Sequence, residues 1–163
     1  MQYPWEEAPR RYHQHKMHIK PFYIDKYPVT NAEFKKFLDA TRYHPRDDRN
    51  FLRDWKNGAY LEGWVKKLVT WVSIEDARAY AAWAGKRLPH EWDWQYAAQG
   101  TDGRIYPWGN KWDSAAIRAP DKRREMGTPS NADAYPKGVS PFGIMDLVGN
   151  LWQSIDEFVQ TPS

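Results

Sequence analysis

The sequence predicts an α+β domain of irregular architecture, with two to three helices, short strands and long loops. Three observations indicate this class. Apolar residues recur at helical spacing behind capping motifs, the β-branched and aromatic runs are short, and Pro and Gly interrupt any regular pattern after Gly109. The 163 residues are predicted to form one domain, residues 1–163, which is long enough to bury a core.

The first predicted helix begins at a capping box formed by Thr30 and Glu33. Phe34, Phe37 and Leu38 follow at helical spacing, so we expect these three side chains to pack inward.

A second capping box, Ser73 with Asp76, predicts a helix from Ile74 to Ala84 that Gly85 terminates. A third helix is predicted over residues 91–99, closed by a glycine at position 100. Its buried side is expected to consist of Trp92, Tyr96 and either Trp94 or Ala98. The Trp-Asp-Trp spacing favours a core on two sides over a platform on which nucleic-acid bases stack.

Strands and loops are predicted for the rest of the chain. Residues 22–29 and 69–72 have the β-branched and aromatic composition of strands. Residues 45–68 and 111–141 are expected to be long loops, and residues 106–110 a rigid turn. Residues 142–153 form an apolar run, most of which is expected to be buried.

Composition argues against disorder, membrane insertion and nucleic-acid binding. Aromatic residues make up 16% of the chain, and no apolar run reaches the length of a transmembrane helix. The net charge is +3, and the densest basic run, residues 122–124, is flanked by acidic residues, as in a solvated loop. Residues 1–6 lack the pattern of a signal peptide, which leaves the compartment unknown, with the cytoplasm as the default.

No catalytic residue can be assigned from a motif. The sequence lacks GxSxG, GxGxxG, HExxH, Walker and EF-hand patterns and contains no cysteine, which excludes disulfides, thiolate metal sites and cysteine nucleophiles within these residues. The carboxylates at positions 91, 93, 156 and 157 are expected to be exposed charges rather than an acid/base pair. His13, His15 and His18 do not converge on one side of a strand, so an exposed entry segment is favoured over a metal site.

Asp146, Gly149, Leu151 and Gln153 form the candidate metal site. If residues 149–153 are extended, two backbone carbonyls and two side-chain oxygens are available to a hard cation, and Ca²⁺ accepts such mixed oxygen ligands. Alternatively, Asp146 and Gln153 cap turns and hydrogen-bond to the backbone. Polar groups in an apolar run require one of these solutions.

Several stretches resemble a known family. They occur in the family's order: 22–25 with 27–34, then 72–73, 79–80, 83–89, 91–92 and 94–98, then Tyr-Pro-Trp-Gly-Asn at 106–110 and Asp-Leu-Val-Gly-Asn-Leu-Trp-Gln at 146–153. On these matches the chain is identified as a member of the formylglycine-generating enzyme, or sulfatase-modifying factor, family.

The resemblance implies an irregular C-type-lectin-like fold that calcium stabilises in some members. Asp146, Gly149, Leu151 and Gln153 fall on one of the family's calcium sites, at which the last ligand is usually Glu. A second calcium site is expected to be degraded, since residues 116–117 read Ala-Ile where an Asn-led pair is usual. The family's enzymes convert a sulfatase cysteine to formylglycine, so a protein or peptide substrate is implied.

The departures from the family pattern predict a domain without its chemistry. The family's oxidases bind copper with two cysteines in the C-terminal part of the domain, and the 163 residues contain none. Ser154 replaces the second Trp of the usual Trp-Glu-Trp, and both the opening strand and the closing strands of the family are missing. We therefore expect a truncated, oxidoreductase-like domain that is inactive as given. The alternatives are a non-enzymatic ligand-binding module of C-type-lectin-like fold and the C-terminal domain of an iron-dependent sulfoxide synthase of the ergothioneine type.

Overall fold

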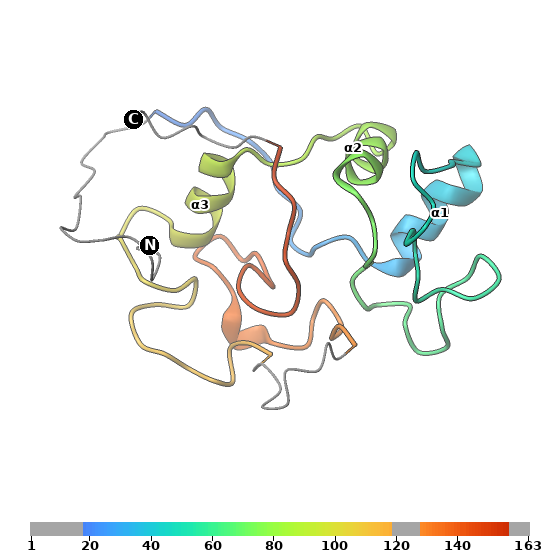
Figure 1. Cartoon of the computed structure of the whole chain (residues 1–163). Helices are drawn as coiled ribbons and strands as arrows, with labels where there is room; N and C mark the ends of the chain where they lie inside the picture. The colour runs from blue at the N-terminus through green and yellow to red at the C-terminus, as the bar shows by residue number, and fades with distance from the viewer. Residues whose placement is uncertain (1–17, 119–127, 157–163) are drawn as a thin grey trace, which may run out of the picture.

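Three α-helices carry most of the regular structure of the described part of the chain (Figure 1). The computed structural model describes residues 18–118 and 128–156, and contains α1 (Asn31–Thr41), α2 (Ile74–Trp83), α3 (Glu91–Gln99) and a short 3-10 turn, η1 (Pro136–Gly138). Within these ranges the β pairing consists of isolated bridges. Three helices with sparse β pairing are consistent with the predicted α+β class. None of the helices in these ranges is long and apolar enough to cross a membrane.

Both predicted capping boxes are present. At the start of α1 the Glu33 carboxylate accepts a hydrogen bond of 2.9 Å from the Thr30 amide, and at the start of α2 the Asp76 carboxylate accepts one of 2.7 Å from the Ser73 amide. Gly85 follows α2 with φ +70°, and its amide donates to the carbonyl of Ala82. This left-handed glycine ends the helix as predicted.

One hydrophobic cluster joins α1, α2 and the loop between them. Phe34 and Phe37 are 1% and 2% exposed, and the ring of Tyr80 from α2 stacks on Phe34 at a centroid distance of 5.6 Å. Leu52 from the predicted loop over residues 45–68 completes the buried set. The inward packing predicted for α1 is therefore confirmed for its two phenylalanines, and the loop folds back onto the helices because its aromatic and aliphatic residues have apolar partners there.

A second cluster forms where α3 meets the C-terminal segment. Ala97 and Ala98 of α3 pack with Ile144 and Leu147, and Trp94 lies partly buried against them. The prediction that Trp92 belongs to the buried side was wrong, because the indole is 38% exposed. Small alanine side chains allow the helix to approach residues 144–147 closely, which places Trp92 on the outer surface.

The apolar run over residues 142–153 is buried in its first half only. Residues 144–147 are buried, whereas Phe142 is 52% exposed and Trp152 fully exposed. The prediction of a mostly buried run is therefore correct for residues 144–147 and wrong for both ends.

Regular strands over residues 22–29 and 69–72 were predicted, and this was wrong. A single bridge pairs Thr30 with Leu68, supported by a hydrogen bond of 3.1 Å from the Val69 amide to the Val29 carbonyl. The pairing ends there because Thr30 is already the cap of α1. β-branched composition indicates a surface suited to a strand, but a strand also needs a neighbouring chain along its length.

The side chain of Asn31 holds α1 to the loop that would have supplied that neighbour. It is 1% exposed, and its amide nitrogen donates to the carbonyls of Trp64, Lys67 and Leu68 at 3.1, 3.0 and 3.4 Å. Its carbonyl oxygen accepts from the indole of Trp55 at 2.9 Å. The carboxamide thus adds to the backbone bonds that the Trp64 and Lys67 carbonyls already accept, and it supplies the partner of the Leu68 carbonyl and of the Trp55 indole.

We predict that Asn31→Ala lowers the free energy of unfolding by about 2 to 3 kcal/mol, because it removes the partner of the Leu68 carbonyl and of the Trp55 indole N–H. Urea denaturation followed by Trp fluorescence measures this loss. The exposed Asn50 offers a matched control, since Asn50→Ala removes the same carboxamide from a solvated position. Equal stability of the two variants would contradict the proposed role of Asn31.

Candidate functional site

The candidate site lies at the end of a short buried segment that two backbone contacts fix in place. The amide of Met145 donates to the carbonyl of Lys26 at 2.8 Å, and the amide of Ser140 donates to the carbonyl of Ile144 at 2.9 Å. The Ser140 hydroxyl in turn accepts from the amide of Ile144 at 3.3 Å. These bonds satisfy the backbone of a segment that belongs to no regular element, so that residues 144–147 can be buried.

Asp146 brings a carboxylate into this buried segment. The residue is 6% exposed and has φ 57°, a left-handed conformation that Asp tolerates better than most residues. Its carboxylate accepts a hydrogen bond of 3.0 Å from the side-chain amide of Asn150. No Lys, Arg or His within the described residues forms an ion pair with it. A buried negative charge is therefore held by an amide donor and by no cation.

Burial raises the pKa of Asp146 above its ordinary value. The hydrogen bond from Asn150 favours the ionised form and opposes this shift, while the negative charge of Asp133 adds to it. The carboxyl group is thus harder to ionise in the folded protein than in the unfolded chain.

Asn150 ties the Asp146 loop to residue 130. Its side-chain oxygen accepts from the Ser130 amide at 2.9 Å, while its amide nitrogen reaches the Asp146 carboxylate. The sequence reasoning did not assign Asn150 to the site. The signal available was its position beside Gly149 within an apolar run, where a buried carboxamide needs partners on both its ends.

Gly149 and Leu151, on either side of Asn150, supply the two backbone carbonyl groups of the predicted ligand set. Gly149 has φ 82° and Asn150 has φ 54°, so the expected extended conformation of residues 149–153 was wrong at its beginning. A Cβ atom on Gly149 would lie 3.3 Å from the Cβ of Ile117, which leaves little room for a side chain. Neither the Gly149 nor the Leu151 carbonyl accepts a hydrogen bond within the described residues.

Gln153 returns to the backbone of Asp146. Its amide nitrogen donates a short hydrogen bond to the Asp146 carbonyl, and its side-chain oxygen accepts from the indole of Trp94 at 3.5 Å. The structure therefore contains the hydrogen-bonded arrangement that was the alternative to metal binding for Gln153. The carboxamide oxygen is oriented toward Trp94.

Three of the four predicted ligand positions carry an oxygen of a kind that a hard cation binds. Within the described residues the Asp146 carboxylate has no cationic partner, and the carbonyl oxygens of Gly149 and Leu151 accept no hydrogen bond. The side chain of Gln153 would have to rotate to turn its oxygen away from Trp94. Within residues 18–118 and 128–156, no group of three His, Cys, Asp or Glu side chains is placed to hold a metal, so any ion here would depend mainly on neutral oxygens.

Among the other predicted residues, Ile117 lies beside Gly149 of the candidate site. Ala116 and Ile117 are buried at 3% and 6% exposure, and serve as packing partners. His18 is exposed, whereas His13, His15, Glu157 and the basic run at 122–124 lie outside the described residues.

The expectation that Asp93 is an unpartnered surface charge was wrong. Its side chain is 11% exposed, forms an ion pair of 2.8 Å with Arg87 and accepts a hydrogen bond of 3.1 Å from the amide of His90. Asp156 accepts a hydrogen bond of 2.7 Å from the guanidinium of Arg78. Each of these two carboxylates is thus paired with an arginine.

Comparison with known proteins gives a family for most of the chain. The family model described as the sulfatase-modifying factor enzyme 1-like domain matches residues 3–162. The inactive C-alpha-formylglycine-generating enzyme 2 of Bos taurus is 31% identical over 83% of this chain, and the formylglycine-generating enzyme of Mycobacterium tuberculosis is 30% identical over 93%. The hercynine oxygenase of Mycolicibacterium smegmatis is 32% identical over 85%. The chain spans 59%, 67% and 38% of the lengths of these three relatives.

We predict that Asp146→Asn gains stability over the wild type as the pH rises, in buffer containing EDTA. Because the folded-state pKa of Asp146 is raised, the folded protein holds this proton more tightly, and its stability falls as pH rises from the unfolded pKa of about 3.9 through the folded value. Asparagine keeps the left-handed turn and removes the charge. Thermal unfolding of both proteins from acidic to neutral pH measures the difference in their stability. If that difference did not change with pH, the ionised Asp146 would not destabilise the folded protein and the prediction would be wrong.

Proposed function

Because the chain belongs to the family of sulfatase-modifying factor enzyme 1-like domains, we propose that these 163 residues are part of a formylglycine-generating-type domain and that, by themselves, they bind a cysteine-containing protein segment without oxidising it. The observation that carries this proposal is the absence of cysteine from all 163 residues. The oxidation known for the family requires two thiolates that hold copper, and these residues offer no thiolate. One relative over most of the chain is itself named an inactive formylglycine-generating enzyme, which agrees with such a role.

We also propose the C-type-lectin-like architecture implied by the resemblance. The long loop over residues 45–68 packs its side chains onto α1 and α2, and the described part of the chain has isolated bridges in place of regular strands. Such a fold depends on side-chain hydrogen bonds and on packing more than on ladders of backbone bonds.

Within this architecture we propose a structural calcium ion at the Asp146 loop. Asp146 would supply the charged ligand, Gly149 and Leu151 the carbonyl oxygens, and Gln153 a fourth oxygen after rotation of its side chain. When bound, the ion would neutralise the buried carboxylate and fix the turn at residues 149–151. It has no chemical step to perform in this proposal.

Each of the alternative functions predicts a different ligand. A non-enzymatic binding module would bind a ligand unrelated to cysteine. A domain of an iron-dependent synthase would be expected to bind hercynine, the compound in the name of one relative. The assay below separates these functions from the proposed one, because it measures binding and conversion independently.

We predict that the chain binds a sulfatase-derived peptide containing cysteine and leaves that cysteine unchanged. Fluorescence anisotropy of the labelled peptide measures binding, and mass spectrometry after incubation with copper and oxygen measures conversion of the thiol to an aldehyde. The same peptide with Ser in place of Cys shows whether the thiol contributes to recognition.

Two results would overturn this proposal. Conversion of cysteine to formylglycine by the isolated chain would show that oxidation needs no cysteine of its own. Failure to bind the peptide, together with saturable binding of hercynine, would favour the synthase-like function.

We predict that millimolar calcium raises the melting temperature of the wild-type chain by several degrees, because an ion that binds only the folded state stabilises it by mass action. Asp146→Ala and Asp146→Asn should abolish the response. Magnesium serves as the control ion, since its demand for octahedral geometry disfavours this mixed and irregular ligand set. A melting curve that calcium leaves unchanged would contradict the proposal of a metal site.

A further inference from the structure

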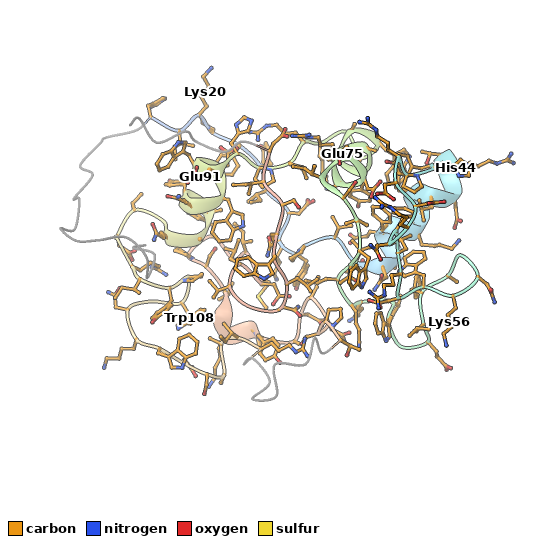
Figure 2. The ribbon with its side chains drawn as sticks, viewed as in Figure 1. Lys20, His44, Lys56, Glu75, Glu91 and Trp108 are labelled. Atoms are coloured by element: carbon orange, nitrogen blue, oxygen red, sulfur yellow. The ribbon has the colours of Figure 1, made fainter. Side chains whose placement is uncertain are left out.

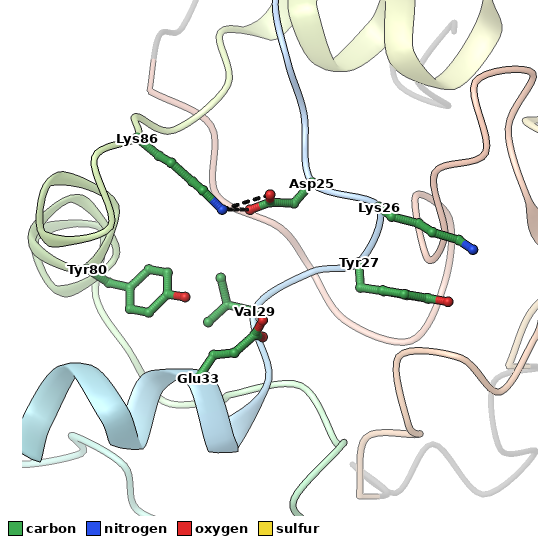
Figure 3. A pocket seen from close by; sticks show the side chains of 7 residues that line it. All are labelled: Asp25, Lys26, Tyr27, Val29, Glu33, Tyr80 and Lys86. Atoms are coloured by element: carbon green, nitrogen blue, oxygen red, sulfur yellow. Dashed lines mark hydrogen bonds and ion pairs between the residues drawn. The ribbon is translucent and has the colours of Figure 1, made fainter.

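A small pocket opens between the segment that precedes α1 and the middle of α2 (Figure 3). Its volume is about 150 Å³, enough for one functional group with a short apolar stem. The residues that line it are Asp25, Lys26, Tyr27, Val29, Glu33, Tyr80 and Lys86. They come from the segment before α1, from α1, from α2 and from the residues after α2, so the fold, and not local sequence, brings them together.

The charges that line the pocket do not balance locally. Lys86 neutralises Asp25, with its ammonium 2.8 and 2.7 Å from the two carboxylate oxygens. Lys26 extends over the ring of Tyr27, 5.2 Å from its centroid, and away from the other lining residues. Glu33 forms no ion pair with any described residue, which leaves one uncompensated negative charge.

Glu33 also has a free oxygen. Both of its hydrogen bonds to Thr30 go to the same carboxylate oxygen, Oε2, at 2.9 Å from the amide and 2.7 Å from the hydroxyl. The capping box therefore fixes the position of the carboxylate while Oε1 keeps its capacity to accept.

Tyr80 presents a hydroxyl group to the same space. Its ring is held by stacking on Phe34 and by an edge contact with Phe37, at centroid distances of 5.6 and 5.8 Å. The hydroxyl is directed into the pocket beside Val29 and forms no hydrogen bond with any described residue (Figure 3). Burial and the negative charges of Glu33 and Asp25 raise the pKa of Tyr80 to about 12, so this hydroxyl stays neutral and can donate or accept.

We propose that this pocket binds a primary ammonium group, whose N–H donors bond to the free oxygen of Glu33 and to the hydroxyl of Tyr80. Val29 offers an apolar wall for the alkyl stem that carries the ammonium. A carboxylate ligand is disfavoured by the charge of Glu33. The ammonium can belong to a small free amine or to a lysine side chain of a partner protein, since both present the same three donors on a flexible stem.

The proposal does not rest on the family function, because its ligand contains neither cysteine nor a metal ion. Its failure would leave the peptide and calcium experiments unaffected, and their failure would leave this pocket unchanged.

The test is an NMR titration of the ¹⁵N-labelled chain with two ammonium probes, n-butylammonium and N-acetyl-lysine methylamide. We expect saturable shifts at the amides of Val29, Glu33 and Tyr80, with millimolar affinity because the site is partly open to solvent. N-acetyl-norleucine methylamide, which has a similar stem without the charge, should produce no such shifts. Equal affinity for the two ammonium probes indicates that a free amine suffices, whereas tighter binding of the lysine derivative indicates a protein side chain.

Two variants test the assigned groups. Glu33→Gln keeps a capping-box residue and removes the charge, and should weaken ammonium binding about fivefold. Tyr80→Phe keeps the stacked ring, removes the hydroxyl and should weaken binding about threefold. Glu62→Gln removes the same charge from an exposed position outside the pocket and should leave affinity unchanged. Equal shifts with the norleucine analogue, or wild-type affinity in both pocket variants, would overturn the proposal.

Discussion

The carboxamide of Asn31 is the interaction on which the helical half of the structure depends. A chain with few regular elements still has to satisfy every buried backbone group, and a long loop packed onto helices has few partners for its carbonyls. Asn31 supplies these partners from the first residue of α1, where it bonds to the carbonyls of Trp64, Lys67 and Leu68. The helix and the loop are thus joined at the position where the capping box already fixes the helix start.

The segment that leads into α1 also connects this anchored helix start to the candidate site. The segment leading into α1 passes Lys26, whose carbonyl accepts the amide of Met145, one residue before Asp146. The same segment carries one wall of the ammonium pocket (Figure 3). By contrast with this packed segment, the side chains of Lys20, His44 and Lys56 extend outward from the edge of the ribbon (Figure 2). One segment, which bends at residues 26–27, therefore lines the ammonium pocket and supports the backbone of the Asp146 loop, and it is held by Asn31 at one end and by Met145 at the other.

Local signals in the sequence predicted the helices, and non-local ones were needed for the rest. Capping boxes at Thr30 and Ser73 are complete within four residues, so their positions could be read directly. The failure of the predicted strands has a different origin, because pairing depends on which distant segment lies alongside. Gln153 lies beside Asp146 through a hydrogen bond to its backbone carbonyl, as the hydrogen-bonded alternative expects, while calcium binding stays a prediction. The calcium hypothesis missed Asn150, whose role depends on Ser130, twenty residues away.

Asp146 and Glu33 illustrate how burial decides what an uncompensated carboxylate can do. At Asp146 the charge is buried, so ionisation is costly and any cation that binds there stabilises the folded chain as a whole. Glu33 is exposed, so water screens its charge and the helix cap holds it at little cost. A ligand at Glu33 therefore gains only a few-fold in affinity from the charge, and the hydroxyl of Tyr80 and the shape of the pocket add to its selectivity. The first position is thus suited to a structural ion, and the second to weak, exchangeable recognition.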